Sequence, residues 1–154
     1  ALCRRYGVPF LVNDNVDVAL RCGADGVHVG QDDMAAAQVR QRVGRDRIVG
    51  VSAHSVAQAL EAVKNGADYL GVGAAFSTST KRDANVLPRG VLHDICEAVD
   101  VPVVAIGGIS RANIMRLSGT GVDGVALVSA IFAAEDIEAE CRALRALSEK
   151  MAGA

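Results

Sequence analysis

Acidic residues shortly after two apolar runs are the first candidates for chemistry in this sequence. Asp14 follows the run 9–12 and Asn13, and the pair Asp32-Asp33 follows the run 26–29. If these runs are neighbouring parallel strands about 5 Å apart, the carboxylates converge at one edge of the sheet. One or two carboxylates together with a substrate phosphate suit Mg²⁺. Helix capping is the alternative, because both sites directly precede helical patterns.

A serine and two histidines lie near the same strand ends. Ser52 follows the run 48–51 and Ser55 is better placed to cap the next helix, so the Ser52 hydroxyl is a candidate ligand contact or a plain structural serine. His28 faces away from its two valine neighbours, which favours an interior, hydrogen-bonded histidine over a ligand contact. His54 resembles an ordinary loop residue, and we assign it no function.

Two later segments have compositions that suit an anion. The stretch 73–89 has no regular pattern and carries hydroxyls next to a lysine: Thr78, Ser79, Thr80 and Lys81. Long loops of compact domains are usually functional, with a solvated linker as the alternative here. Gly107-Gly108 ends an apolar run and is expected to enter a helix, so its N–H groups can approach an oxyanion. Ser129 follows the next run, as in the phosphate site of barrel folds.

The elements that must position these residues are strands and helices in alternation. Short runs rich in Val and Ile are typical of parallel strands buried on both faces, and they span residues 9–12, 26–29, 48–51, 69–72, 103–106 and 124–128. Helical patterns cover residues 16–21, 34–43, 55–64, 91–98, 111–117 and 137–147. Ser55 and Gln58 form the pattern of a capping box. The sequence therefore predicts successive βα units.

A repeated turn supports this interpretation. It occurs as Gly23-Ala24-Asp25-Gly26, Gly66-Ala67-Asp68-Tyr69 and Gly121-Val122-Asp123-Gly124. Glycine suits the left-handed position after a helix, and a short Asp can turn the chain into the strand. Repeated βα units indicate a doubly wound sheet or a (β/α)8 barrel. We favour the barrel because no glycine-rich turn follows the first strand; a full barrel has about 250 residues, so about six of its eight units are present.

Length and composition set the broad class. The chain has 154 residues, 51% of them apolar and 22% charged, which suits one folded domain and excludes a disordered or collagen-like chain. No apolar stretch reaches the roughly 18–20 residues of a membrane span. The chain begins at Ala1 without a secretory signal, so we expect an N-terminally incomplete barrel domain over residues 1–154, from within a longer polypeptide or after processing.

Charge and cysteine usage restrict the partners. A net charge of −2 with no tryptophan gives neither a basic surface nor stacking platforms for nucleic acid. The cysteines have no CxxC spacing and no histidine at metal-ligand spacing: Cys3, Cys22, Cys96 and Cys141. They are expected to be free, mostly buried thiols in a reducing compartment. We therefore expect a cytoplasmic protein without nucleic-acid or membrane partners.

Taken in order and spacing, these motifs resemble the thiamine-phosphate synthase family from Tyr6 to about Leu147. The matching segments are Val12-Asn13-Asp14, Gly23 to Asp33, Gly50-Val51-Ser52-Ala53-His54, Gly66 to Gly73, Thr78-Ser79-Thr80-Lys81, Ala105 to Ile109, and Val128 to Ile131. The resemblance implies a (β/α)8 TIM barrel of thiamine biosynthesis. Its reaction would condense hydroxymethylpyrimidine diphosphate with thiazole phosphate and release diphosphate, with Mg²⁺ as cofactor.

The resemblance also implies functions for individual residues. Asn13, Ser52 and Lys81 would bind the diphosphate, with Ser52 and Lys81 as the catalytic residues. Asp14 and Asp33 would hold the metal ion. The other substrate-binding residues, around the thiazole phosphate, would be Thr78, Ser79, Thr80, Gly108, Val128 and Ser129. The implied displacement needs no general base.

The sequence departs from the family pattern at three places. The Gln-x-Arg…Lys motif that grips the diphosphate is absent, because the chain starts after it. Ala74 and Ser77 stand where the family usually has proline. Related thiazole tautomerases carry a histidine at the position of Ala74 and generally lack the paired metal motifs, so Ala74 with Asp14 and Asp33 favours the synthase. A tautomerase-like or non-catalytic phosphate-binding barrel is the alternative.

Three expectations follow for the molecule. Six strands should form a curved, partial barrel with exposed edges near Phe10 and Val125, closed by an upstream segment or by a second copy of the chain. The segment 76–85 should close over the substrate and exclude water. Residues 1–154 alone should self-associate and lack synthase activity.

Overall fold

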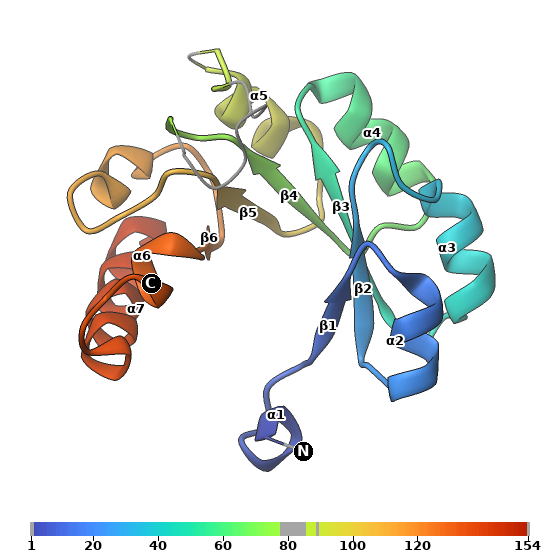
Figure 1. Cartoon of the computed structure of the whole chain (residues 1–154). Coiled ribbons are helices and arrows are strands. Elements are labelled where there is room, and N and C mark those ends of the chain that lie inside the picture. The colour runs from blue at the N-terminus through green and yellow to red at the C-terminus, as the bar shows by residue number, and fades with distance from the viewer. Residues whose placement is uncertain (1, 78–85, 89, 154) are drawn as a thin grey trace.

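The computed structural model describes residues 2–77, 86–88 and 90–153. Six parallel strands form one sheet in sequence order: β1 (Leu11–Asn13), β2 (Gly26–Val29), β3 (Ile48–Ala53), β4 (Tyr69–Gly73), β5 (Val103–Ile106) and β6 (Gly124–Ala126). The sheet curls into part of a barrel with helices around its outer side (Figure 1). β1 and β6 lie at the two ends of the strand order. The predicted six-stranded partial barrel is confirmed.

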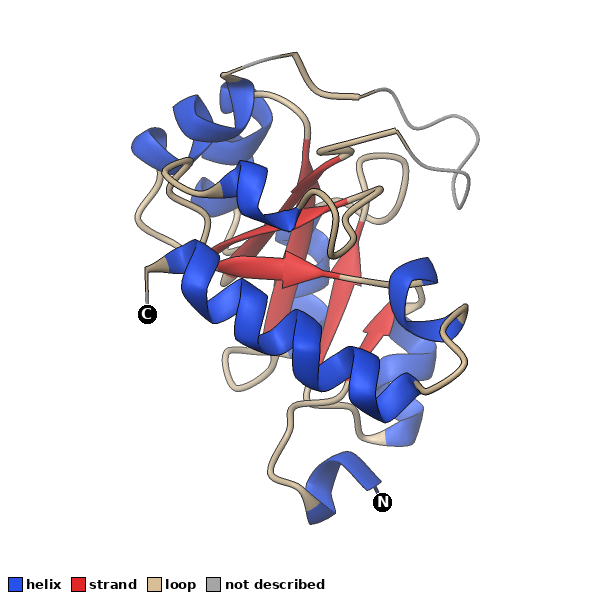
Figure 2. Cartoon of the chain, turned by 90° about the vertical axis from the view of Figure 1, so that its left-hand side faces the viewer, coloured by secondary structure: helices blue, strands red, loops and turns tan. Residues whose placement is uncertain are grey.

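Helices alternate with the strands, as the sequence predicts. They are α1 (Leu2–Arg5), α2 (Val16–Cys22), α3 (Ala36–Val43), α4 (Val56–Lys64), α5 (Val91–Ala98), the 3-10 helix η1 (Ile114–Leu117), α6 (Ser129–Phe132) and α7 (Ile137–Ala152). Figure 2 shows the long α7 beside the β6 end of the sheet. No helix in the described part of the chain is long and apolar enough to cross a membrane.

The prediction of burial on both faces holds for β4, whose residues after Tyr69 are all buried, but not for every strand. On β3, Val49, Val51 and Ala53 are at most 4% exposed and belong to the core between sheet and helices. The alternate residues, Gly50 and Ser52, face the inner side of the curl. Because the period of a strand is two, one strand supplies both the core and the inner wall of the barrel.

Several element boundaries differ from the prediction. The strand predicted over 124–128 ends at Ala126, and α6 begins at Ser129. The helix predicted over 111–117 is reduced to η1, and α7 continues five residues beyond Leu147 to Ala152. The capping box is only half formed: Ser55 Oγ accepts from the Gln58 N–H, but Gln58 Oε1 accepts from the N–H of His54. Tertiary packing decides such ends more than local propensity does.

The repeated Gly-x-Asp turn has a structural function at the amino ends of the strands. Its glycines have positive φ values of 63°, 90° and 87°, as predicted for the position after a helix. Each aspartate binds one residue of the neighbouring strand twice, donating its N–H to the carbonyl and accepting the N–H on its carboxylate. The pairs are Asp25 with Phe10, Asp68 with Val49, and Asp123 with Val103. The aspartate thus joins adjacent strands rather than only turning the chain.

The cysteines are free, as expected, but they are less buried than predicted. Cys22 and Cys141 are exposed, and Cys3 and Cys96 are half-buried. Of the exposed pair, Cys22 ends α2 and Cys141 lies in α7.

Candidate functional site

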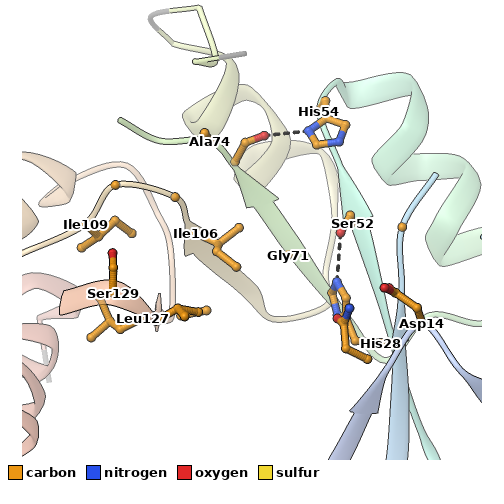
Figure 3. Close-up of a pocket in the computed structure, with 17 residues that line it drawn as sticks. Asp14, His28, Ser52, His54, Gly71, Ala74, Ile106, Ile109, Leu127 and Ser129 are labelled. Atoms are coloured by element: carbon orange, nitrogen blue, oxygen red, sulfur yellow. Dashed lines mark hydrogen bonds between the residues drawn. The ribbon is translucent and has the colours of Figure 1, made fainter. Parts of the chain in front are cut away.

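A pocket of about 400 Å³ opens at the carboxyl ends of the strands, where parallel α/β folds carry their functional sites (Figure 3). Its lining has two halves. After β1, β2 and β3 it is polar: Asn13, Asp14, His28, Ser52 and His54. Around the ends of β5 and β6 it is formed by glycines, apolar groups and Ser129, over 106–109 and 126–129. Of the residues predicted from strand ends, Asn13, Asp14, Ser52, Gly108, Val128 and Ser129 line this one cavity, and Asp33 does not.

Asp14 stands at the mouth of this pocket in an unusual backbone conformation. Its φ of 64° is the one positive value among the described non-glycine residues, and its N–H donates to the His28 carbonyl at 2.7 Å. The cap of α2 is Asn15, whose side chain accepts from the Val18 N–H at 3.0 Å. Asp14 is therefore not the helix cap, and its carboxylate belongs to the pocket wall.

Asp33 lies in the next loop and is exposed, and it does not itself line the pocket. Its Oδ2 accepts the N–H of Gly30, a pocket residue, at 2.7 Å. It does not cap α3, whose cap position is Ala35 with no side-chain hydrogen bond. Capping is thus excluded for both aspartates. No group of three or more His, Cys, Asp or Glu that could hold a metal ion occurs within 2–77, 86–88 and 90–153.

The Ser52 hydroxyl, for which the sequence left a ligand contact and a structural function open, is hydrogen-bonded within the protein. Its Oγ lies 3.0 Å from His28 Nε2, and His28 Nδ1 lies 2.9 Å from the Tyr69 hydroxyl. The predicted interior hydrogen bonds of His28 are confirmed, and the ring also lines the pocket. Burial raises the pKa of Tyr69, so its hydroxyl stays protonated at neutral pH.

His54, to which we assign no function from the sequence, also lines the pocket. Its Nδ1 donates to the Gly73 carbonyl at 2.6 Å and so joins the carboxyl ends of β3 and β4 (Figure 3). Because a carbonyl oxygen only accepts hydrogen bonds, Nδ1 must carry a hydrogen in this contact. The sequence signal that could have identified His54 is its position two residues after Ser52, at the carboxyl end of the same strand. Tyr69 gave no such signal, since an aromatic residue at a strand start is usually core.

The glycine pair after β5 forms a tight wall. A Cβ on Gly108, whose φ is 64°, would lie 2.3 Å from the Ser77 carbonyl oxygen, and one on Gly107 would lie 2.7 Å from the Ala74 Cβ. Asn113 fixes the turn, since its Nδ2 donates to the Gly108 carbonyl and its Oδ1 accepts from the Ser110 N–H. The predicted helix does not begin at this glycine pair, so no helix N-terminus contributes there.

The base of the long loop is attached to this wall. Ala75 and Phe76 donate backbone hydrogen bonds to the carbonyls of Ile106 and Gly107, and the Arg116 guanidinium lies 5.1 Å from the centre of the Phe76 ring. Gly108, Val128 and Ser129 line the pocket as predicted. Thr78, Ser79, Thr80 and Lys81, and with them most of the proposed closing segment 76–85, lie outside the described residues.

The fold and this pocket define a parallel α/β barrel protein with a pocket at the carboxyl ends of its strands. The family model for thiamine monophosphate synthase matches residues 1–131. The chain is 55% identical over 148 residues to the thiamine-phosphate synthase of Chloroflexus aurantiacus, covering 95% of this chain and 68% of that protein. It is 53% identical over 140 residues to that of Ruminiclostridium cellulolyticum, covering 91% and 67%.

A solved structure agrees with this match. Thiamine phosphate pyrophosphorylase from Pyrococcus furiosus superimposes with a TM-score of 0.89 and 44% identity, covering 97% of this chain and 72% of that one. The chain belongs to the thiamine monophosphate synthase family. It spans about two thirds of the length of these relatives.

Proposed function

We propose that the protein is a Mg²⁺-dependent thiamine-phosphate synthase. It joins hydroxymethylpyrimidine diphosphate to thiazole phosphate, giving thiamine phosphate and diphosphate. The observation that carries the proposal is the two-sided pocket, with carboxylate, amide and hydroxyl groups after β1 to β3 and glycines with Ser129 after β5 and β6. Two phosphorylated substrates need two such regions around one reacting centre.

The polar half fits Mg²⁺ that is bound together with diphosphate. Asp14 and Asp33 follow adjacent strands, and neither caps a helix. Two carboxylates are too few for an all-protein metal cage, but they suit Mg²⁺, which shares its ligands with substrate phosphates and water. When bound, the ion would stabilise the charge that grows on the departing diphosphate. Asp14 and Asp33 would hold it.

The remaining polar groups bind and orient the diphosphate. Asn13 and Ser52 line the pocket beside Asp14 and offer an amide and a hydroxyl donor. Lys81, by the family motif, supplies the cation for the same group. The Gly107-Gly108 turn, with Val128 and Ser129, receives the thiazole phosphate, together with the hydroxyls of 78–80.

The chemistry is a displacement with a loose transition state. The bond between the pyrimidine methylene carbon and the diphosphate oxygen breaks, and its electron pair leaves with the diphosphate. The lone pair of the thiazole nitrogen then forms the new carbon–nitrogen bond, so no residue has to remove a proton. Ile106, Ile109 and Leu127 form an apolar wall that limits water near the cationic carbon.

Ala74 favours the synthase over a tautomerase. Its methyl group is buried at 6% exposure, lines the pocket and packs against Gly107. A methyl group cannot act as the acid or base of a tautomerisation. We further propose a cytoplasmic enzyme that acts on small phosphorylated molecules, and a homo-oligomer is compatible with its exposed sheet edges.

Product formation by the protein expressed from its complete gene tests the proposal. With both substrates and Mg²⁺, thiamine phosphate and inorganic diphosphate should form in equal amounts, as measured by chromatography. Chelation of the metal by EDTA should stop the reaction, and added Mg²⁺ should restore it. Binding of thiazole phosphate without any product would instead favour a non-catalytic barrel, and conversion between thiazole isomers would favour a tautomerase.

A further inference from the structure

Three side chains from adjacent strands form a hydrogen-bonded chain inside the barrel. The Tyr69 hydroxyl on β4 lies 2.9 Å from His28 Nδ1 on β2, and His28 Nε2 lies 3.0 Å from Ser52 Oγ on β3. The Tyr69 and His28 rings are 5.4 Å apart between centres. Figure 3 shows the end of this chain, where the imidazole points to Ser52 at the pocket wall.

Two glycines make room for this chain. Gly50 is in register between His28 and Tyr69, and a Cβ there would lie 2.3 Å from Tyr69 Cζ. Gly71 is in register with Ser52, and a Cβ there would lie 2.9 Å from His28 Cε1. Neither position needs a positive φ, so the absent side chain is the reason for glycine. The sheet is therefore built around these two rings.

Either ring nitrogen of His28 can donate or accept, so we assign the direction of the hydrogens from the Tyr69 end, with a neutral imidazole. The Tyr69 O–H has one hydrogen-bond acceptor in the described part of the chain, His28 Nδ1. When Tyr69 donates to Nδ1, the ring hydrogen is on Nε2 and is donated to Ser52 Oγ. Ser52 then accepts from the histidine and directs its own hydrogen away from it. The hydroxyl is thereby presented to the pocket as a donor, which is what an anionic oxygen requires.

We propose that His28 and Tyr69 are positioning residues that fix the Ser52 hydroxyl as a hydrogen-bond donor to the substrate diphosphate. This inference rests on the proposed function, in which Ser52 binds that group. Without the Tyr69 hydroxyl, the imidazole can take the other tautomer and accept from Ser52. The serine would then turn a lone pair towards the anion and lose the contact.

Calorimetric titration of the complete protein with inorganic diphosphate and Mg²⁺ tests this without turnover. Ser52→Ala should weaken binding about 10- to 100-fold, because a hydrogen bond to a charged group is lost. Tyr69→Phe should weaken it about three- to ten-fold. The amide nitrogen of Gln reaches the place of Nε2 and that of Asn the place of Nδ1, so His28→Gln should recover most of the affinity that His28→Asn loses.

A double-mutant cycle separates positioning from general damage. In the Ser52→Ala background, Tyr69→Phe should change the affinity less than about two-fold, because its effect passes through the serine. An equal loss with and without Ser52, or no rescue by Gln, would overturn the proposal. The exposed residues Tyr6 and His93 provide matched controls: Tyr6→Phe and His93→Asn should leave binding unchanged.

The outcomes distinguish this inference from the proposed function. If the unmodified protein binds Mg²⁺ and diphosphate but makes no thiamine phosphate, the synthase proposal fails and the affinities of the variants still decide the role of His28 and Tyr69. If the unmodified protein does not bind diphosphate, both proposals fail.

Discussion

Aspartates serve different purposes at the two ends of the same sheet. At the amino ends, Asp25, Asp68 and Asp123 each bind backbone groups of a neighbouring strand through both N–H and carboxylate. At the carboxyl ends, Asp14 lines the pocket, and Asp33 binds the backbone of its own loop. The first set joins strands together, whereas the second set lies in the loops that follow β1 and β2.

The backbone follows the same division. The amino-end turns use glycine in the conformation that glycine adopts easily, whereas at the carboxyl end a non-glycine residue, Asp14, has a φ of 64°. A non-glycine residue in this region costs of order 1 kcal/mol or more, and such strain is typically found at functional sites. We infer that the amino end carries stability and the carboxyl end carries the chemistry, as in other barrels of this type.

The largest expected effect is on activity and oligomeric state, and it comes from leaving the barrel open, because the amino and carboxyl ends of the strands belong to the same sheet. In the described part of the chain β1 pairs only with β2 and β6 only with β5, so one edge of each strand is open, and open parallel edges favour association. For residues 1–154 expressed by themselves, we expect no measurable thiamine phosphate formation and a self-associated species in analytical ultracentrifugation. The protein from the complete gene is the control. A monomeric, active preparation of residues 1–154 would show that thiamine phosphate can form without a closed barrel.

Loss of the rim carboxylates should have the next largest effect. Asp14→Asn and Asp33→Asn should each lower Mg²⁺-dependent turnover by orders of magnitude, because each removes a charged ligand of the proposed ion. The free energy of unfolding should change little, since both aspartates are exposed residues of the loops after β1 and β2. Asp32→Asn is the matched control and should be tolerated much better. Near-normal activity of both rim variants would leave these aspartates without a role in catalysis.

The sequence predicted the rim well because position along a strand determines where a side chain ends up. Once the βα repeat is recognised, Asp14, Ser52, Gly108 and Ser129 must reach one edge of the sheet, and they do. The sequence could not show that the Ser52 hydroxyl is bonded to His28. That bond depends on the room left by Gly50 and Gly71 on neighbouring strands, which only the register reveals.

The missed elements have a similar cause. Tyr69 and His54 are single residues whose contacts cross strands, so no local pattern marks them. The helix predicted over 111–117 has helical spacing, but its first turn is replaced by the Asn113 hydrogen bonds that hold Ser110 and Gly108. The register between strands determined the contacts of Tyr69 and His54, and side-chain hydrogen bonds to the backbone determined where η1 begins. Local helix or strand propensity determined neither.

At the amino end the expected effect is on stability. Asp68 accepts from the Val49 N–H and from Arg40, whose guanidinium also donates to the Gly66 and Arg47 carbonyls. Asp68→Ala should lower the free energy of unfolding by about 1–3 kcal/mol, measured by urea denaturation, with kcat unchanged. Asp46→Ala, at an exposed aspartate, should stay within about 0.5 kcal/mol of the unmodified protein. A fall in kcat for Asp68→Ala would contradict the division between the two ends.

The smallest expected effect is on the reactivity of a thiol, that of Cys96. Burial, followed by the negative charge of Asp123, raises the pKa of the half-buried Cys96 thiol from 9.0 to about 11. At pH 8 only about one thiol in a thousand is then ionised, so iodoacetamide should label Cys96 far more slowly than the exposed Cys22 and Cys141. Because the folded-state pKa lies above the unfolded one, the thiol's contribution to stability falls as the pH rises from about 9 towards 11. Mass spectrometry of the labelled peptides measures the rates, and labelling in urea should make them equal. Equal rates in the folded protein would show that the packing that half-buries Cys96 opens readily.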